Sequence, residues 1–356
     1  MGYFEIDFLA VETAKSGDAI PMRYQIGDQT TVHVTDGGFQ STGSTVVAHL
    51  NSVYGTSHVD HVMVTHPDGD HAAGLRTVLE ECTVGVLWML RPWTYAAEII
   101  DRFATYNSVA ALEARLRKVY PNLAALEEMA IERGIPVYEP FQGAQVGAFT
   151  VMAPSRNRYL DLIVESERTP EAVEEESISI FEFALKAAAA AVAFVRSAWG
   201  EEVFSPNPTS AENEMSVIQY AYLEGSRILL TGDAGRDALN EAADFAPYIG
   251  LALPGIERIQ IPHHGSRRNV STEVLDRWLG PRLGSNPGSG TFTAVVSSAK
   301  ADTHHPRKAV IRAFMHRGAN VFQTEGVSIC SHGGSRPARN WGQATPVGYP
   351  DDQEGA

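Results

Sequence analysis

Residues 65–71 read Thr65-His66-Pro67-Asp68-Gly69-Asp70-His71. Two histidines and two aspartates within six positions give four potential metal ligands. The apolar run just before them, residues 61–65, predicts a buried strand, and residues 72–81 predict a helix. A strand end followed by a tight turn lets alternating side chains converge on one point, and Gly69 permits such a turn. Because His and Asp together suit Zn²⁺, Mn²⁺ or Fe²⁺, the segment predicts a metal site at a strand end.

Three later segments repeat this arrangement. Asp233 ends an apolar strand, where a lone aspartate would ordinarily be a helix N-cap. His263 and His264 follow a predicted strand at 259–261, and His304 and His305 follow one at 293–297. Adjacent histidines on a strand point to opposite faces, so we expect at most one of each pair to meet a given metal. Four such signals at four strand ends together predict one shared centre.

The rest of the chain alternates short strands with helices. Further strands are predicted at 4–11, 30–34, 84–90, 136–138, 217–222 and 227–231, and helices at 42–54, 108–133, 272–279 and 307–317. Residues 157–212 break the pattern, since an acidic stretch leads into an apolar, helix-forming run at 178–199. We expect a helix packed on the body of the protein, or a lid or dimer contact near the active site. The tail 331–356 is rich in Gly, Pro and charge and is predicted to be disordered.

Composition narrows the function classes. The net charge of −15 argues against a broad nucleic-acid footprint, which needs clustered Lys and Arg. Two cysteines, Cys82 and Cys330, cannot build a disulfide framework. The run 178–199 carries Glu182, Lys186 and Arg196, unlike a membrane span, and the N-terminus lacks a signal-peptide pattern. We therefore expect a cytoplasmic protein that does not act in a membrane.

The pattern His66-x-Asp68-x-Asp70-His71 resembles the metallo-β-lactamase superfamily, in the variant typical of the hydrolase domain of ComEC-type competence proteins. Other segments carry the same resemblance: residues 16–20, Asp36-Gly37, 213–216, 229–233, 263–266, His305-Pro306 and 324–326. The resemblance implies an α/β fold of the αββα sandwich type, with two mixed β-sheets flanked by helices. This domain would cover residues 1–330, with 157–212 as a helical insertion.

The resemblance also implies roles for the site residues. His66 and Asp68 would hold a first metal, Asp70 and His71 a second, with Asp233 as the bridge. His305 would complete the second site. His263 is similar to a histidine that serves as general acid in tRNA 3′-processing ribonucleases, and whether it is an acid or a ligand here stays open.

One departure concerns the metals. No histidine occurs from residue 72 to 262, where the superfamily supplies another first-site ligand. The first site is therefore rich in oxygen, which favours Mn²⁺ or Mg²⁺ relative to Zn²⁺. Two divalent ions, Zn or Mn, are the expected cofactors, and the first can be weak or recruited with substrate.

These expectations describe a hydrolase that uses a metal-activated water. Asp70 would orient the water, and His263 or His264 would protonate the leaving oxygen. The favoured reaction is phosphodiester hydrolysis, by a phosphodiesterase or nuclease acting on a nucleotide or short nucleic acid. Two alternatives remain: hydrolysis of a lactone, thioester or β-lactam, and a non-catalytic metal-binding module. Basic residues beside the histidine clusters are either phosphate contacts or ordinary surface charges: Arg267, Arg268, Lys300 and Arg307.

Overall fold

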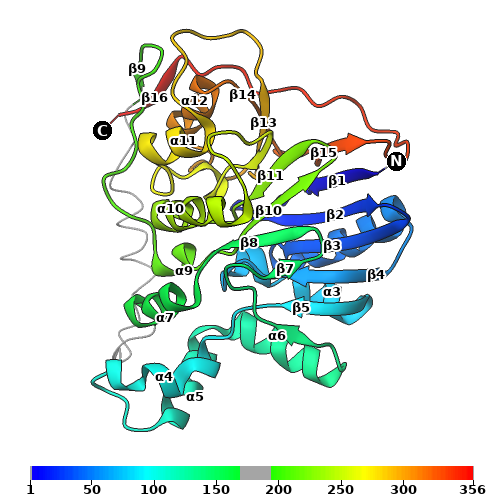
Figure 1. The fold of residues 1–356 in the computed structure, drawn as a ribbon, viewed down its shortest axis with the longest axis vertical. Coiled ribbons are helices and arrows are strands. Elements are labelled where there is room, and N and C mark those ends of the chain that lie inside the picture. Colours follow the sequence, from blue (N-terminus) through cyan, green and yellow to red (C-terminus); the bar gives the residue numbers. More distant parts are fainter. Residues whose placement is uncertain (1, 169–193, 356) are drawn as a thin grey trace.

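Two seven-stranded sheets form the centre of the computed structural model, which describes residues 2–168 and 194–355 (Figure 1). The first sheet has the order β15-β1-β2-β3-β4-β5-β6, with strands Ile329–Gly334, Tyr3–Phe8, Ala19–Ile26, Gln29–Gly37, His58–Met63, Thr83–Trp88 and Val137–Tyr138. The second has the order β14-β13-β12-β11-β10-β8-β7, with strands Ala319–Gln323, Phe292–Val296, Arg258–Gln260, Ser226–Leu230, Ile218–Leu223, Phe149–Ala153 and Gln145–Val146. Both sheets are mixed: β3 to β6 and β11 to β14 pair in parallel, and the other neighbours are antiparallel.

Apolar side chains from both sheets meet in a core between them. It joins Phe4, Ile6 and Phe8 of β1 to Ile228 and Leu230 of β11. A second core lies between the first sheet and its helices, and a third between the second sheet and α10, α11 and α12 (Figure 1). The layers are therefore helix, sheet, sheet and helix, and the predicted αββα architecture is confirmed.

Each helix predicted outside residues 157–212 is present, although one of them is divided in two, and the helices at Ala96–Ile99 and Arg236–Phe245 were not predicted. The helices are α1 Gly43–His49, α2 Gly69–Ala72, α3 Leu75–Glu81, α4 Ala96–Ile99, α5 Val109–Val119, α6 Pro121–Glu132, α7 Arg156–Glu165, α9 Ala211–Glu214, α10 Arg236–Phe245, α11 Thr272–Leu279 and α12 Lys308–His316. The single helix expected at 108–133 is two, α5 and α6. Pro121 begins α6, because proline fits the first helical turn but has no N–H to continue α5.

The region 157–212 differs in part from its prediction. Residues 178–193 of the expected 178–199 helix lie outside the described residues, so its role in a lid or homo-oligomer stays a prediction. Residues Phe194–Arg196 are not helical; they form β9, an antiparallel partner of β16 (Asp352–Glu354). The helical prediction was wrong there, because a partner strand more than 150 residues away supplies the ladder. In the described part of the chain, no helix combines the length and apolarity needed to cross a bilayer.

The tail is the second correction. The composition of 331–356 predicts disorder, but Ser331–Gly334 complete β15 and residues 352–354 form β16. The Arg339 guanidinium enters the first sheet, 3.0 Å from a Glu5 carboxylate oxygen and 2.8 Å from one of Asp7. Both acidic side chains are fully buried. Long-range ion pairs thus order a segment whose local composition does not.

Replacing Arg339 by methionine should lower the free energy of unfolding by roughly 3 kcal/mol, because two buried carboxylates lose a counter-charge. Urea denaturation followed by circular dichroism measures this. The matched control is Arg102→Met, which removes an ion pair to Asp161 with both side chains about half exposed. We expect a change below about 1 kcal/mol for that variant, and equal losses for the two variants would contradict a structural role for the tail.

Candidate metal centre

The centre lies where loops from both sheets meet. His66 to His71 follow β4 of the first sheet, Asp233 follows β11, and His263 and His264 follow β12 of the second. Backbone hydrogen bonds join the loops: Val217 N–H donates to the Thr65 carbonyl at 3.0 Å, and His263 N–H to the Gly232 carbonyl at 3.2 Å. Gly232 has φ +50°, and a Cβ there would lie 3.0 Å from the Thr65 side chain. A glycine is needed at this close approach.

Asp233 is the common neighbour of four histidines. Its Oδ1 lies 3.1 Å from His71 Nε2 and 3.9 Å from His264 Nε2. Its Oδ2 lies 3.8 Å from His66 Nε2 and 3.6 Å from His263 Nδ1. Each carboxylate oxygen thus faces its own pair of imidazoles, and the carboxylate is almost fully buried. The bridging role predicted for Asp233 stays a prediction.

Several of these atoms lack a hydrogen-bond partner. Among the described residues, His66 Nε2, His71 Nε2, His264 Nε2 and Asp233 Oδ1 are all buried and unpaired. Each unpaired buried polar atom costs about 1–3 kcal/mol, so four in one place need a common explanation. Imidazole nitrogens and a carboxylate oxygen are the donors that Zn²⁺ and Mn²⁺ take, and the residues therefore fit a metal centre.

The other ring nitrogen of each of these three histidines is already bound. His71 Nδ1 lies 2.8 Å from Asp36 Oδ2, and His264 Nδ1 lies 3.1 Å from the Ser297 carbonyl. The Thr65 hydroxyl donates to Asp36 Oδ2 at 2.6 Å, so it is free to accept from His66 Nδ1 at 3.0 Å. An Nδ1–H held in this way leaves Nε2 with a free lone pair, as a metal ligand requires. Asp36 orients both His66 and His71.

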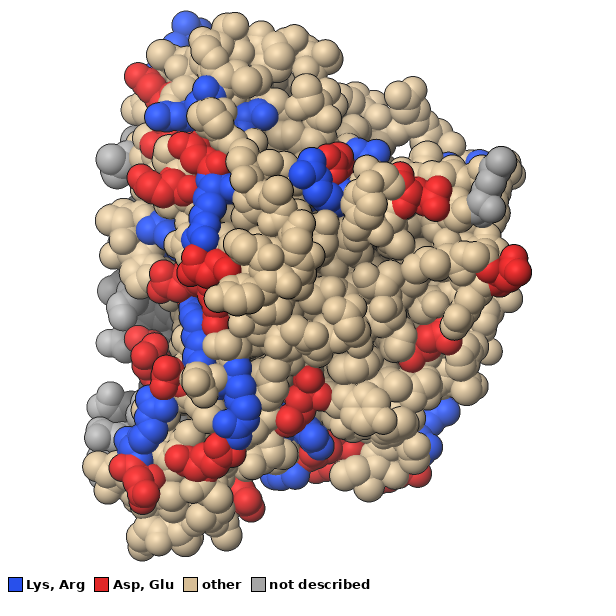
Figure 2. Space-filling view, in the orientation of Figure 1, with Lys and Arg blue, Asp and Glu red and all other residues tan. Residues whose placement is uncertain are grey.

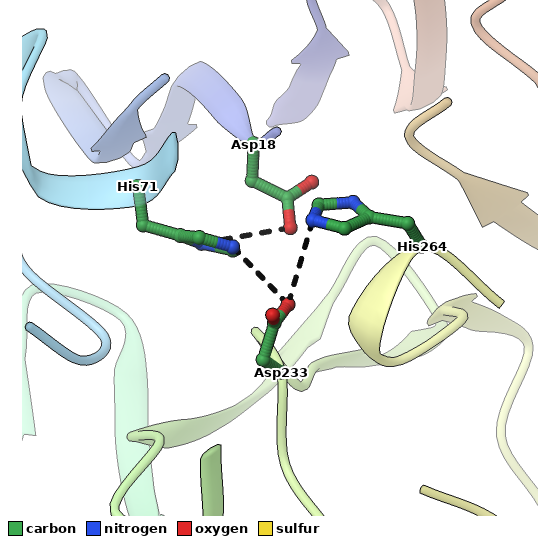
Figure 3. A group of neighbouring side chains, drawn as sticks. All are labelled: Asp18, His71, Asp233 and His264. Atoms are coloured by element: carbon green, nitrogen blue, oxygen red, sulfur yellow. Dashed lines mark ion pairs between the residues drawn. The ribbon is translucent and has the colours of Figure 1, made fainter. Parts of the chain in front are cut away.

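Asp18 is the member that the sequence did not assign. Its Oδ2 accepts from Gln260 Nε2 at 2.9 Å and lies 3.7 Å from His71 Nδ1, while its Oδ1 has no hydrogen-bond partner within residues 2–168 and 194–355. Ligand atoms of Asp18, His71, Asp233 and His264 all lie within 4.8 Å of one another, and the four side chains point toward a common centre (Figure 3). The segment 16–20 carried the family resemblance, but an aspartate just before an apolar strand gave no sign that it would be buried here.

The remaining predicted ligands lie at the edge of this group. Asp70 Oδ2 is 3.7 Å from His264 Nε2. Asp68 Oδ2 is 3.9 Å from His66 Nε2, and Asp68 Oδ1 is 2.8 Å from the guanidinium of Arg168. Asp70 and Asp68 are thus placed beside the histidines as expected. Arg168 was not predicted, because it lies 100 residues away in an irregular segment.

His263 and His305 stand together at the rim. Their rings stack with centroids 5.6 Å apart, and His305 is 6.3 Å from the His264 ring. His305 Nδ1 lies 3.3 Å from an Asp302 carboxylate oxygen, and Asn213 Nδ2 lies 2.7 Å from His263 Nδ1. His305 is therefore near the centre but outside the closely spaced group of four, and its assignment to the second site stays a prediction.

The predicted phosphate contacts do not all face the centre freely. The Arg267 guanidinium donates to the Gly355 carbonyl at 2.9 Å, which ties it to the tail. Arg307 Nη2 approaches His304 Nδ1 at 3.5 Å. Arg268 and Lys300 are exposed. Arg267 thus has a structural contact. Phosphate binding stays a prediction for Arg268, Lys300 and Arg307.

The carboxylates change the proton affinity of the buried histidines. Burial is the largest influence and lowers the pKa of His264 and His71, but the negative charge of Asp233 and neighbouring carboxylates outweighs it. The pKa of His264 rises to about 9, and that of His71 also rises. Burial lowers the pKa of His263 to about 4, against the pull of Asp233. The pKa of Asp233 falls because the surrounding histidines outweigh the effect of its burial.

Comparisons with known proteins give distant likenesses. No family model matches the chain, and no curated protein matches its sequence. Among solved structures, it is similar to the metallo-β-lactamase fold protein YhfI from Bacillus subtilis, at 11% identity and a TM-score of 0.41 over 94% of this chain and 100% of that one. It is also similar to a diphosphatase of the PhnP family, at 10% identity and a TM-score of 0.36 over 93% and 98%. A third similar structure is that of the hydrolase AbOPH of the β-lactamase superfamily, at 11% identity and a TM-score of 0.33. That match covers 68% of this chain and 72% of AbOPH.

Replacing Asp36 by asparagine should weaken binding of Mn²⁺ or Zn²⁺ by about 10- to 100-fold, because His71 loses its carboxylate acceptor and the Thr65 hydroxyl, which accepts from His66, loses the carboxylate that orients it. Equilibrium dialysis with metal analysis measures this. Asp60→Asn is the control: Asp60 accepts from a backbone N–H of β3, away from the centre. Unchanged metal affinity in Asp36→Asn would show that Asp36 has no orienting role.

The raised histidine pKa values predict a pH effect on the metal-free protein. A group with a raised folded-state pKa stabilises the fold fully below its unfolded pKa and loses that contribution as the pH rises through the folded value. The shift of His264 from 6.5 to about 9 corresponds to about 3 kcal/mol, lost mostly between these pH values.

Urea denaturation in the presence of a chelator, from pH 6 to 9.5, measures this loss. Bound metal must displace the same protons, so metal binding should release protons below pH 9 and remove the loss of stability. A metal-free protein that is equally stable at pH 6.5 and pH 9 would refute the raised pKa of His264.

Proposed function

We propose that this chain is a metal-dependent hydrolase of the metallo-β-lactamase superfamily that cleaves phosphodiester bonds in nucleotides or short nucleic acids. The observation that carries the proposal is Asp233, whose two oxygens each face a pair of histidines within 4 Å. A carboxylate in that position is suited to bridge two divalent ions. A structural zinc site, by contrast, is closed by four ligands around one ion.

Divalent ions held by these residues would supply Lewis acidity and a water of lowered pKa. The residues of the chain would do the rest. His66, His71 and His264 would hold position through their bound Nδ1 atoms, and Asp70, with a side chain 26% exposed, can accept a proton from an attacking water.

His263 is suited to meet the leaving oxygen. Asn213 Nδ2 lies within hydrogen-bond distance of His263 Nδ1, so a neutral His263 would carry its hydrogen on Nε2. Its side chain is 25% exposed, whereas that of His264 is 3% exposed. His263 therefore favours the role of hydrogen-bond donor to substrate, and His264 that of ligand.

Charge favours a short substrate. On the face drawn in Figure 2, Lys and Arg alternate with Asp and Glu rather than gather in one basic patch. The chain carries 43 acidic and 28 basic residues. A long nucleic acid needs many phosphate contacts, whereas a mononucleotide or short oligonucleotide needs few.

We expect turnover of bis-p-nitrophenyl phosphate with Mn²⁺ or Zn²⁺, and little turnover of a lactone or nitrocefin. Asp233→Asn should lower kcat/KM by more than roughly 100-fold, because loss of an outer-shell partner alone typically costs about 10- to 100-fold. The matched control is Asp244→Asn, since Asp244 is an exposed residue paired with Arg277.

Each alternative has its own outcome in this assay. Exclusive turnover of the lactone or of nitrocefin would replace the phosphodiester assignment with an ester or lactam hydrolase. Metal binding without turnover of any of these substrates, and full biological effect of Asp233→Asn, would favour a non-catalytic metal-binding module.

A further inference from the structure

The centre divides into two unequal halves. The inner subsite consists of Asp18, His71, His264 and Asp233 Oδ1, and all four residues are less than 5% exposed. The outer subsite consists of His66, Asp68, His263 and Asp233 Oδ2. Two of its members, Asp68 and His263, have side chains 24% and 25% exposed.

The donors of the inner subsite are free. His71 Nε2, His264 Nε2, Asp233 Oδ1 and Asp18 Oδ1 are buried and have no hydrogen-bond partner among the described residues, although His71 Nε2 and Asp233 Oδ1 form an ion pair 3.1 Å apart within the subsite. In the described part of the chain, none of these atoms is paired with a lysine or an arginine, so a metal would displace no cationic side chain. Asp18 is also held in place by Gln260, whose amide donates to its other oxygen at 2.9 Å. Two imidazoles and two carboxylates offer the inner subsite a full set of four protein ligands.

The outer subsite, in contrast, already holds a cation. The Arg168 guanidinium lies 2.8 Å from Asp68 Oδ1 and 3.7 Å from a Glu212 carboxylate oxygen. The backbone N–H of Arg168 donates to the Ser166 hydroxyl, which in turn donates to Glu212. Arg168 is therefore fixed between two carboxylates.

A second outer donor also has a partner. Asn213 Nδ2 lies 2.7 Å from His263 Nδ1 and donates to the Thr209 hydroxyl, also at 2.7 Å. A metal at Nδ1 would have to displace this amide. Among the described residues, Asp68 Oδ1 thus has an ion pair with Arg168 and His263 Nδ1 has the Asn213 amide. The third donor besides Asp233, His66 Nε2, has no hydrogen-bond partner there.

We propose that the inner subsite binds the first divalent ion, with Asp18 as one of its ligands, and that Arg168 is the resident cation of the outer subsite. This inference rests on the proposed metal centre and adds its order of filling. A second ion binds Asp68 in competition with Arg168, because the guanidinium already offsets the charge of that carboxylate. The released guanidinium then stands beside the centre, free to contact an anionic substrate.

Equilibrium dialysis against Mn²⁺, with metal analysis of the retained protein, tests the order of filling. The protein as it stands should bind one equivalent tightly and a second at least about 10-fold more weakly. Arg168→Gln should tighten binding of the second Mn²⁺ equivalent by about 10-fold and leave the affinity for the first equivalent unchanged. Arg168→Lys, which keeps the positive charge, should bind Mn²⁺ like the parent protein. Arg102→Gln, at an exposed ion pair with Asp161, is the matched control.

Asp18→Asn tests the inner ligand. The substitution should weaken binding of the first Mn²⁺ equivalent by at least about 10-fold. The circular dichroism spectrum and the urea midpoint should show that the variant is folded. Unchanged affinity for the first equivalent in a folded Asp18→Asn protein would overturn the role of Asp18.

If the parent protein binds two Mn²⁺ equivalents with equal affinity, or if the Arg168→Gln protein binds Mn²⁺ like the parent, the proposed role of Arg168 is overturned. Neither result would touch the proposed hydrolase. Failure of the parent protein to bind any Mn²⁺ or Zn²⁺ would instead remove the proposed function itself, so the two proposals fail separately.

Discussion

The buried carboxylate of Asp233 constrains the rest of this structure. A charge in that position is costly unless other charges or ligands compensate it, and here four imidazoles surround it. These imidazoles come from β4 of one sheet and β12 of the other, so they meet only when the two sheets pack in one register. Gly232 allows the required approach, since a Cβ there would lie only 3.0 Å from the Thr65 side chain and the φ of +50° is unfavourable for other residues. The core between the sheets and the centre at their edge therefore depend on the same packing.

Periodicity and strand-end chemistry predicted much of this arrangement. The apolar runs ending at residues 65, 231 and 261 located the loops, and the His and Asp residues after them were correctly expected to gather. The carboxyl ends of parallel strands meet at one edge of a sheet, which makes such convergence a property of the topology. The break before Pro121 also follows from local chemistry and could have been read from the proline.

The features that escaped prediction depend on long-range contacts. The buried carboxylate of Asp18 accepts a hydrogen bond from Gln260, 242 residues later. Arg168 reaches Asp68 across 100 residues from a segment without periodicity. Arg339 pairs with Glu5 and Asp7 on the first strand, so the tail is ordered although its composition resembles that of a disordered segment. In each case the decisive partner is remote in sequence, and no local pattern of residues marks it.

The tail also contacts the segments that follow the histidine pairs. Glu354 accepts hydrogen bonds from the backbone N–H groups of Lys308 and Ala309, at the start of α12 and three residues after His305. The neighbouring Gly355 carbonyl accepts from Arg267, three residues after His264. Two adjacent residues at the end of the tail thus hold the segments that follow both histidine pairs. The buried histidines then keep a fixed geometry, while Asp68, Asp70, His263 and His305, each about one-quarter exposed, form the side of the centre that a substrate can reach. A site that must bind both metal and substrate requires buried ligands of fixed geometry on one side and partly exposed side chains on the other.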